Sequence, residues 1–185
     1  MVSLSQRDDG AEVVEACRQG DRAAFRELYD VYKDRVYSIA LYFFHGDRTA
    51  ASDVTQQVFL KLLANIGQYR GDSVFSTWLY RLVVNVCLDE ARTRITRPVD
   101  SARLEAVAAS DSQEATYSRL QEAASIRAAV ASLPPKFRIA VLLRYFDDLS
   151  YEQMAKALRC SMGTVASRLN RGHKLLAEKL KQVIE

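Results

Sequence analysis

The residues with the clearest chemical potential in this chain are hydroxyl and guanidinium groups that recur near its C-terminus. At about 100° per residue, a helix over this stretch brings four of them to one side, namely Thr164, Ser167, Arg168 and Arg171. Such groups hydrogen-bond DNA base edges and phosphates. Another side of the same helix would carry Val165, Leu169, Gly172 and Leu176. One face is therefore expected to pack against protein, and the other is free to contact DNA.

A tight turn between two helices is predicted to position this stripe. Ser150 is a favourable N-cap, and Gln153 three residues later completes a capping box, so a short first helix is expected. Arg159 and Cys160 form the turn, and Ser161 caps the second helix. This is the arrangement of a helix-turn-helix, whose second helix enters the major groove. A solvated basic helix on the surface of an all-helical protein shows the same pattern, so both interpretations remain open at this point.

The composition favours an all-helical fold. The 185 residues include only 7 Gly and 3 Pro, and 49% are hydrophobic, which is enough to build real cores. The net charge is +3, and residues 161–185 alone hold five Lys and Arg against two Glu. Residues 98–127 are acidic instead, with five carboxylates against three Arg. The positive excess therefore lies in the segment that is predicted to contact DNA.

The sequence offers little for catalysis or metal binding. The three cysteines, Cys17, Cys87 and Cys160, are far apart and only two histidines accompany them, which argues against a zinc site and for a reducing cytoplasm. There is no glycine-rich phosphate loop, no paired set of metal ligands and no Ser-His-Asp arrangement. No apolar run approaches the length of a membrane span. We therefore expect a soluble cytoplasmic protein that is not an enzyme, has no cofactor or metal and does not insert into a membrane.

Two small helical domains are predicted. A short helix near residues 10–18 precedes a long helix that Asp21 caps and that ends at His45-Gly46-Asp47, and its apolar spacing counts Tyr29 among the core-facing residues. Two more helices are expected near residues 49–66 and 74–94. We assign residues 10–96 to one bundle, 97–122 to a flexible linker and 123–185 to a second domain. The helix near 49–66 has more apolar surface than one core contact requires.

The residues also carry a resemblance to a known family. The segment LPPKFRIAVLLRYFDDLSYEQMAKALRCSMGTVASRLNRGHKLLAEKL resembles region four of the group IV, extracytoplasmic-function (ECF) sigma factors of the sigma-70 family. Region two of the same family is similar to DRAAFRELYDVYKDRVYSIA, ASDVTQQVFLKLLANI and FSTWLYRLVVNVCLDEARTR, in that order. The chain departs from the family pattern at Arg159, where glycine is usual, at Asp148, where glycine often ends the preceding helix, and at Ala166, where lysine is frequent.

The resemblance implies contacts with core RNA polymerase. In the family, the helix that matches residues 51–66 docks on the clamp coiled coil of the largest polymerase subunit. The residues that this implies for the contact lie off the expected core face, with an exposed Phe59 or Leu60 among them. They are Asp53, Gln56, Gln57, Phe59 and Leu60.

The resemblance implies two separate DNA contacts as well. The loop and helix over residues 69–85 would hold the minus-ten element as a single strand, through Tyr69, Arg70, Ser73, Thr77, Trp78, Arg81 and Asn85. Trp78 suits core packing better than base contact. The helix-turn-helix would read the minus-thirty-five element through Met162, Gly163, Thr164, Ser167, Arg168 and Arg171. Arg92, Arg94 and Arg97 also suit phosphate contacts, although basic residues at a helix end are favoured by the helix dipole too.

Three classes of function follow from these observations. The first is a sigma factor that binds core polymerase, directs it to promoters and helps melt the minus-ten element; an anti-sigma factor is a further partner that the family suggests. The second is a stand-alone helix-turn-helix regulator, which predicts a palindromic site and promoter binding without polymerase. The third is an enzyme, for which the residues offer almost nothing. The first agrees best with the residues.

The charge distribution also suggests a closed form of the free protein. The basic tail and the acidic linker have opposite signs, so the C-terminal domain is expected to fold back onto the N-terminal bundle. We expect that this would hide the recognition helix and the clamp-binding helix together, and that the domains separate on polymerase.

Overall fold

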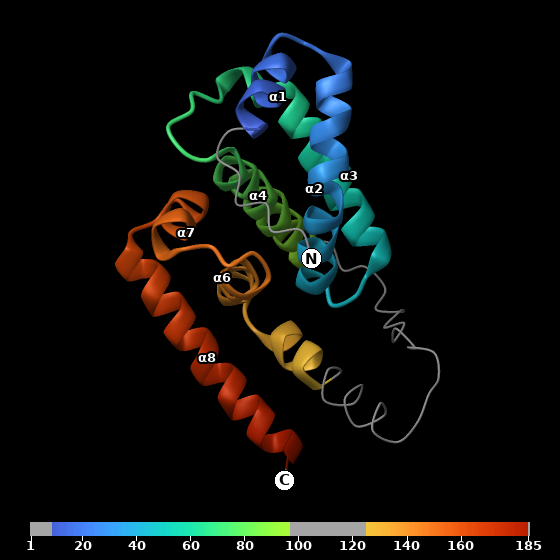
Figure 1. The fold of residues 1–185 in the computed structure, drawn as a ribbon. Coiled ribbons are helices and arrows are strands. Elements are labelled where there is room, and N and C mark those ends of the chain that lie inside the picture. Colours follow the sequence, from blue (N-terminus) through green and yellow to red (C-terminus); the bar gives the residue numbers. More distant parts are fainter. Residues whose placement is uncertain (1–8, 97–124, 185) are drawn as a thin grey trace, which may run out of the picture.

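The computed structural model describes residues 9–96 and 125–184, and every regular element in these two ranges is a helix (Figure 1). The N-terminal range forms α1 (Asp9–Arg18), α2 (Arg22–Phe43), α3 (Arg48–Asn65), the short 3-10 helix η1 (Ile66–Gln68) and α4 (Phe75–Thr96). The C-terminal range is helical over residues 125–132 and continues as α6 (Pro135–Phe146), α7 (Tyr151–Leu158) and α8 (Met162–Ile184). The predicted all-helical fold is confirmed.

Local capping sets where several of these helices begin. The Asp21 carboxylate accepts a hydrogen bond of 2.7 Å from the backbone N–H of Ala23 and starts α2, as predicted. Asp47 does the same for α3 through the N–H of Ala50, at 2.9 Å. The turn before Asp47 requires positive φ at His45 and Gly46, and this ends α2 where the sequence indicated. Each such cap contributes about 1 kcal/mol to helix stability.

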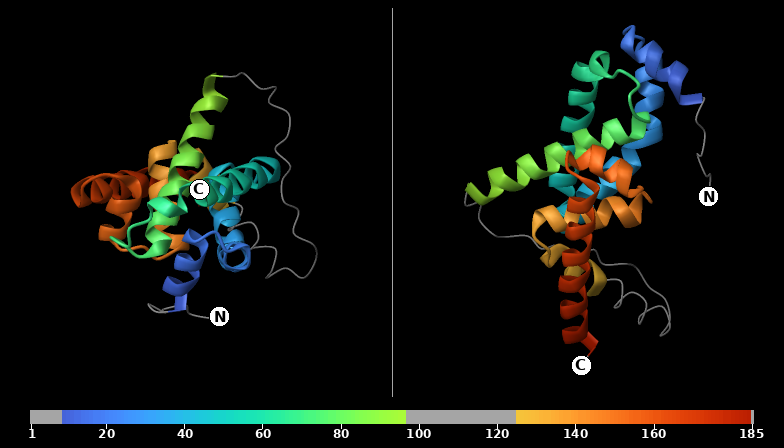
Figure 2. Two further views of the ribbon diagram at one scale, coloured as in Figure 1. Left: turned by 90° about the horizontal axis from the view of Figure 1, so that it is seen from above. Right: turned by 90° about the vertical axis from the view of Figure 1, so that its left-hand side faces the viewer.

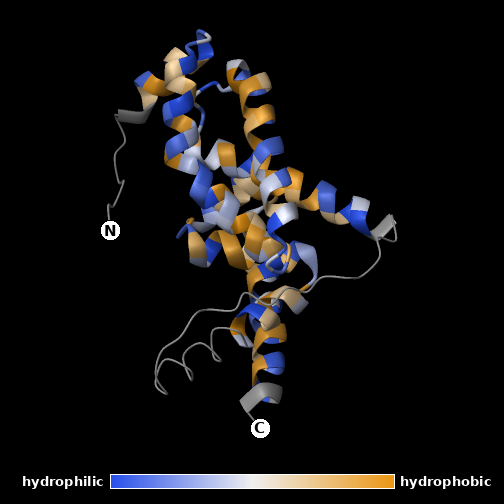
Figure 3. Ribbon diagram, turned by 90° about the vertical axis from the view of Figure 1, so that its right-hand side faces the viewer, coloured by the Kyte–Doolittle hydropathy of each residue, from blue (hydrophilic) through white to orange (hydrophobic). Residues whose placement is uncertain are grey.

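Helix α4 lies between the two groups of helices, with α2 and α3 on one side and α6 and α7 on the other (Figure 2). Leu79, Val83 and Cys87 are completely buried, and so are Leu62 of α3 and Ile39 of α2. Apolar and polar segments alternate along each helix (Figure 3), so each helix presents an apolar side to its neighbours. Complete burial of one such aliphatic side chain stabilises the fold by about 1.5–3 kcal/mol.

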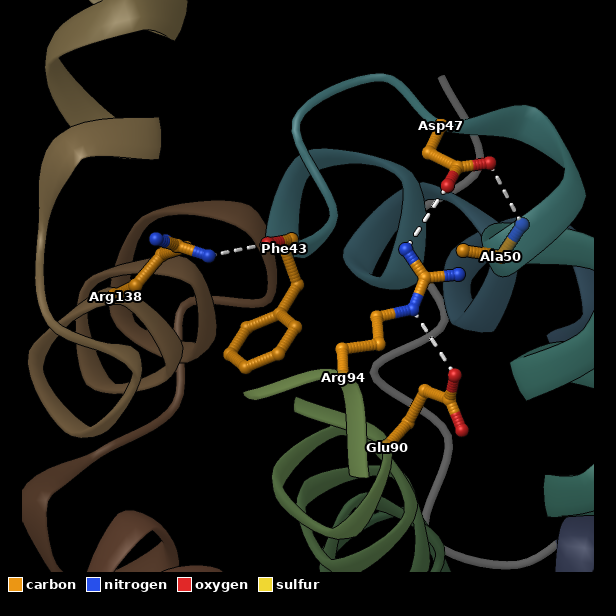
Figure 4. Close-up of polar contacts among 6 residues, drawn as sticks. All are labelled: Phe43, Asp47, Ala50, Glu90, Arg94 and Arg138. Carbon is orange, nitrogen blue, oxygen red and sulfur yellow. Dashed lines mark hydrogen bonds and ion pairs between the residues drawn. The ribbon is translucent and has the colours of Figure 1, made fainter. Parts of the chain in front are cut away.

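The C-terminal end of α4 is tied to the turn between α2 and α3 (Figure 4). The guanidinium of Arg94 pairs with Asp47 at 2.9 Å and with Glu90 at 3.0 Å, and it lies 4.9 Å from the ring centre of Phe44. Arg94 therefore has a structural role in this conformation, which was not predicted. Arg97, which was expected to contact phosphate, lies outside the described residues.

The C-terminal helices fold back onto the N-terminal ones, but not in the way that was expected. The contacts are those of α6 with α2 and of α6 and α7 with α4. The polar side of α8 and the outer side of α3 remain exposed, as Arg171 and Gln57 show. The expectation that the recognition helix and the clamp-binding helix are hidden together is therefore wrong, because the packing uses the apolar sides of α6 and α7 and covers α4 instead.

Within residues 9–96 and 125–184, no helix combines the length and the apolar character that a membrane crossing requires.

Candidate functional site

An apolar groove of about 550 Å³ runs between α2 and α3. Aromatic and aliphatic side chains dominate its lining, and Lys33, Asp34 and Gln56 add polar groups. Leu60 and Leu63 of α3 are more than half exposed, at 59% and 55%. Exposed apolar side chains in a groove of this kind suit one side of a partner helix.

The five residues that were expected to contact polymerase divide into three groups. Gln56 and Leu60 line the groove and are exposed, as predicted. Asp53 and Gln57 are exposed on the same helix but are not part of the lining. Either Phe59 or Leu60 was expected to be exposed, and Leu60 is. Phe59 was also expected to lie off the core face, and this is wrong, because only 4% of it is accessible and it belongs to the buried core.

The burial of Phe59 has a specific cause on the neighbouring helix. Its ring meets the ring of Tyr29 edge to face, with ring centres 4.7 Å apart, so Phe59 forms the floor of the groove. Tyr29 was counted as a core residue from its spacing, yet it is 39% exposed and lines the groove. The sequence of α3 held the signal that Tyr29 lines the groove. The apolar surface of α3 is larger than one core contact requires, so a side chain of α2 was needed to pack against the rest of it.

An aromatic cluster shapes the loop before α4. The Tyr69 hydroxyl donates a hydrogen bond of 2.6 Å to the carbonyl oxygen of Ser73 and so closes the loop. The Tyr69 ring lies 5.6 Å from the ring of Phe75 and 5.7 Å from that of Trp78. Trp78 is only 7% exposed, which agrees with core packing as its main role.

The other residues that were expected at the minus-ten element differ in exposure. Arg70 and Asn85 reach solvent, and Arg81 is half-buried. Thr77 is 2% exposed, and its hydroxyl oxygen has no hydrogen-bond partner within the part of the chain that the structure describes. Burial and, after it, the nearby Arg159 guanidinium lower the pKa of Arg81. The segment is therefore divided between accessible groups and groups that the packing covers.

The helix-turn-helix agrees with its prediction in detail. Ser150 and Gln153 form the complete capping box of α7. The Ser161 hydroxyl accepts a hydrogen bond of 3.1 Å from the backbone N–H of Thr164 and begins α8. Gly172 faces α6 so closely that an added Cβ would lie 3.1 Å from Val141, and this explains a glycine on the packing side.

The outer side of α8 presents the polar residues that were expected there. Gly163, Ser167 and Arg171 are exposed, and Met162 is 57% exposed. Thr164 and Arg168 are half-buried at the edge of this surface. Two buried residues, Val165 and Leu169, hold the opposite side, at 0% and 2% exposed.

Two of the departures from the family pattern have a structural meaning. Arg159 ends α7 with φ 49° and ψ 51°, and Asp148 has φ 50°, so both occupy the left-handed region. The family pattern usually has glycine at the first position and often at the second, because glycine adopts this conformation without steric strain. For other residues the strain costs about 1 kcal/mol. The turns keep their geometry with the substituted residues.

Each of the two parts of the chain matches a known protein family. Residues 28–95 match the family described as Sigma-70 region 2, and residues 123–176 match Sigma-70, region 4. The chain is 32% identical to the RNA polymerase sigma-H factor of Pseudomonas aeruginosa, over 98% of both proteins. The chain belongs to the ECF sigma factors of the sigma-70 family. It is accordingly a transcription initiation factor.

Other relatives and solved structures agree with this assignment. The sigma factor is 33% identical to the ECF RNA polymerase sigma-E factor of Escherichia coli K12, over 98% of this chain and 99% of the relative. Its fold is similar to that of CnrH, solved in complex with the cytosolic domain of CnrY, with a TM-score of 0.70, 20% identity and coverage of 95% and 99%. It is also similar to RpoE of Bartonella quintana, solved with the anti-sigma factor NepR, with a TM-score of 0.67, 23% identity and coverage of 85% and 96%.

Proposed function

We propose that this sigma factor binds core RNA polymerase, directs it to specific promoters and helps to melt the minus-ten element. The observation that carries the proposal is that one chain holds two unlike surfaces on separate groups of helices: the α2–α3 groove and the exposed polar side of α8. A stand-alone regulator needs the second surface but has no use for the first. In this proposal residues 10–96 and 123–185 are the two functional domains, and 97–122 join them.

The groove is proposed as the polymerase contact. Its apolar floor and exposed leucines offer area to a helix, and the resemblance makes that helix part of the clamp coiled coil of the largest subunit. Leu60 supplies exposed apolar area, and Phe59 supports it from below. Asp53, Gln56 and Gln57 would bind polar groups at the rim, which fix orientation more than they add affinity.

The segment over residues 69–85 is proposed to hold the opened minus-ten strand. Base capture from a duplex requires stacking surfaces and polar groups close together. The half-buried Tyr69 supplies a ring that Trp78 supports from the core, and Arg70, Arg81 and Asn85 supply hydrogen-bond donors. Ser73 acts indirectly, because its carbonyl oxygen holds the Tyr69 hydroxyl.

The α8 surface is proposed to read the minus-thirty-five duplex. Met162 to Thr164 lie at the N-terminal end of α8, which enters the major groove first in this motif. Ser167, Arg168 and Arg171 follow along the same side. Arg side chains read guanine edges or bind phosphates.

The protein is proposed to act by binding alone, without a catalytic site, metal or cofactor, and in the cytoplasm, where polymerase and promoters are found. We include an anti-sigma factor among the proposed partners, because CnrH and RpoE were each solved with a bound partner protein.

Run-off transcription tests the function. Core polymerase and genomic DNA fragments from the source organism should give defined transcripts only when the protein is added. The variant Asp53→Arg with Leu60→Ala should abolish both the transcripts and co-purification with core polymerase, because both residues are exposed on α3. A matched variant, Glu27→Arg, changes an exposed residue of α2 outside the groove lining and should behave as wild type. Tight binding to a palindromic site without polymerase, together with no transcripts, would favour the stand-alone regulator.

A further inference from the structure

The outer face of α8 holds an amide side chain that none of the proposed DNA contacts uses. Helix α8 packs on α6 and α7 and lies at the edge of the molecule (Figure 1). Asn170 is exposed on this helix, about two turns after its start at Met162. A duplex that contacts the N-terminal half of α8 therefore meets Asn170 as well.

Asn170 lies nearer the middle of the exposed face than Arg168 does. Val165, Leu169 and Gly172 are buried and mark the packed side of α8. At 100° per residue, Asn170 lies about 130° from the middle of that side and Arg168 only about 70°. This agrees with the exposure of Asn170 and the half-burial of Arg168. The middle of such a face meets the base edges on the floor of the major groove, whereas its margins meet the backbone phosphates.

The hydroxyl groups near Asn170 are already engaged within the protein. The Ser161 and Thr164 hydroxyl oxygens lie 2.9 Å apart, within hydrogen-bond distance. The Ser167 hydroxyl donates a hydrogen bond of 3.0 Å to the carbonyl oxygen of Thr164. In contrast, the carboxamide of Asn170 has no hydrogen-bond partner among residues 9–96 and 125–184. Its N–H donors and its oxygen are therefore all available to a base.

The third departure from the family pattern lies directly beside this amide. Ala166 is exposed one turn before Asn170, and residues four apart are neighbours on a helix surface. A lysine at position 166, which is frequent in the family pattern, would bring an ammonium group within reach of the Asn170 oxygen and compete for it. Alanine leaves the amide unobstructed, and its methyl group suits contact with a thymine methyl group.

We propose that Asn170 is a specificity-determining residue that reads an adenine in the minus-thirty-five element. Its carboxamide oxygen accepts a hydrogen bond from the N6 amino group of the adenine, and its nitrogen donates one to N7. An asparagine of the recognition helix makes the same contact with adenine in the homeodomain variant of the helix-turn-helix. This inference deepens the proposed function and rests on the assignment of α8 to the minus-thirty-five duplex.

Selection from promoters with a randomised minus-thirty-five element tests the inference. Core polymerase with the full-length sigma factor is mixed with the promoter pool, and the bound DNA is sequenced. The wild type should enrich an adenine at one position of either strand. Asn170→Ala should lower the preference at this position about tenfold and leave the other positions unchanged. The same enriched sequence with wild type and variant, or no enriched adenine with the wild type, would overturn the proposal.

Lys174→Ala is the matched control, because it removes an exposed cation one turn after Asn170. Loss of a phosphate contact should weaken binding to all sequences alike and reduce its salt dependence. Loss of a base contact should do neither. A uniform loss with reduced salt dependence in Asn170→Ala would therefore contradict base reading. Circular-dichroism melting checks that both variants fold, as expected for changes at exposed positions.

A base analogue tests the individual hydrogen bond. At the enriched position, 7-deaza-adenine keeps the N6 amino group and lacks the N7 acceptor. This substitution should weaken binding by the wild-type holoenzyme about tenfold and leave binding by Asn170→Ala unchanged, because the variant has no donor for N7. Equal losses for the two proteins would show that Asn170 is only a solvated side chain.

Run-off transcription separates this inference from the proposed function. Defined transcripts with the wild type, together with an unchanged base preference in Asn170→Ala, would refute the role of Asn170 and leave the proposed function in place. No transcripts and no enriched sequence would refute both.

Discussion

Helices α4 and α8 both carry polar residues that suggest DNA contacts, but their surroundings differ. Helix α8 packs one side on α6 and α7 and leaves the other to solvent, so Ser167 and Arg171 are exposed. Helix α4 has neighbours on two sides, and among its polar residues Thr77 is buried while Asn85 is not. A polar residue on a surface helix is accessible in any conformation. A polar residue on a covered side of a central helix, such as Thr77, becomes accessible only if the neighbouring helix moves away.

The largest expected difference between α4 and the α8 region is in the reactivity of their cysteine thiols. Burial raises the pKa of the Cys87 thiol in α4 from 9.0 to about 12, so its thiolate fraction near neutral pH is about a thousandfold lower than for an ordinary thiol. Cys160, in the turn before α8, is only half-buried. An aromatic disulfide reagent at about pH 8 should therefore modify Cys160 quickly and Cys87 only after unfolding.

The same shift has a consequence for stability at alkaline pH. The thiol of the unfolded chain ionises near 9.0, whereas the folded chain keeps Cys87 protonated up to about 12. The unfolded state therefore loses this proton first, and the contribution of Cys87 to stability falls as the pH rises above about 9.

Mass spectrometry after brief thiol labelling measures how fast each cysteine is modified. Equal labelling rates for Cys87 and Cys160 would contradict the packing of α4.

Truncation of Trp78 should show that α4 is a structural helix before it is a DNA-binding one. Trp78→Ala removes a ring that is 7% exposed and contacts Tyr69 and Phe75, so we expect a loss of about 3–5 kcal/mol in the free energy of unfolding. Urea denaturation measures the loss, and Trp78→Phe should lose less. Unchanged stability combined with defective melting of promoters would instead make Trp78 a residue of the base pocket alone.

Removal of a cation from α8 should leave the fold intact and weaken duplex binding. Arg168→Ala is expected to reduce promoter affinity by about 1–3 kcal/mol if the guanidinium contacts a base edge. The comparison is Lys179→Ala, an exposed cation further along the same helix, which should lower affinity much less. Fluorescence anisotropy of polymerase-bound protein on promoter duplex gives both values. Identical losses would mean that only the total charge of α8 matters.

The smallest effect on stability is expected at Asn85, where α4 reaches solvent. Asn85→Ala should change the free energy of unfolding by less than about 0.5 kcal/mol, because the side chain is exposed. It should still slow the formation of open complexes, since an amide at this position is proposed to bind an extruded base. Permanganate footprinting over time measures the rate, and normal melting by this variant would remove Asn85 from the strand-opening surface.

The sequence alone determined the elements and the family. Capping by Asp21, Ser150 and Ser161, the break at His45 and the two sides of α8 were all predicted from residue types and spacing, and the structure confirms them. These features depend on interactions within a few residues of one another. A helix that packs on one side only, such as α8, has one apolar side, and its periodicity then shows which side is exposed.

Only the tertiary structure decided which residues of α3 and α4 are accessible. Phe59 is buried because Tyr29 of another helix lies against it, and Thr77 is buried because α4 has neighbours on two sides. The Tyr80 hydroxyl of α4 donates a hydrogen bond to Asp147, directly after α6, although the two residues are 67 positions apart in the chain. No local sequence pattern indicates a contact at that separation. A helix that is packed on two sides, such as α4, loses the simple periodicity that marks an exposed side, so the packing of α6 and α7 on α4 became visible only once the helices were placed in space.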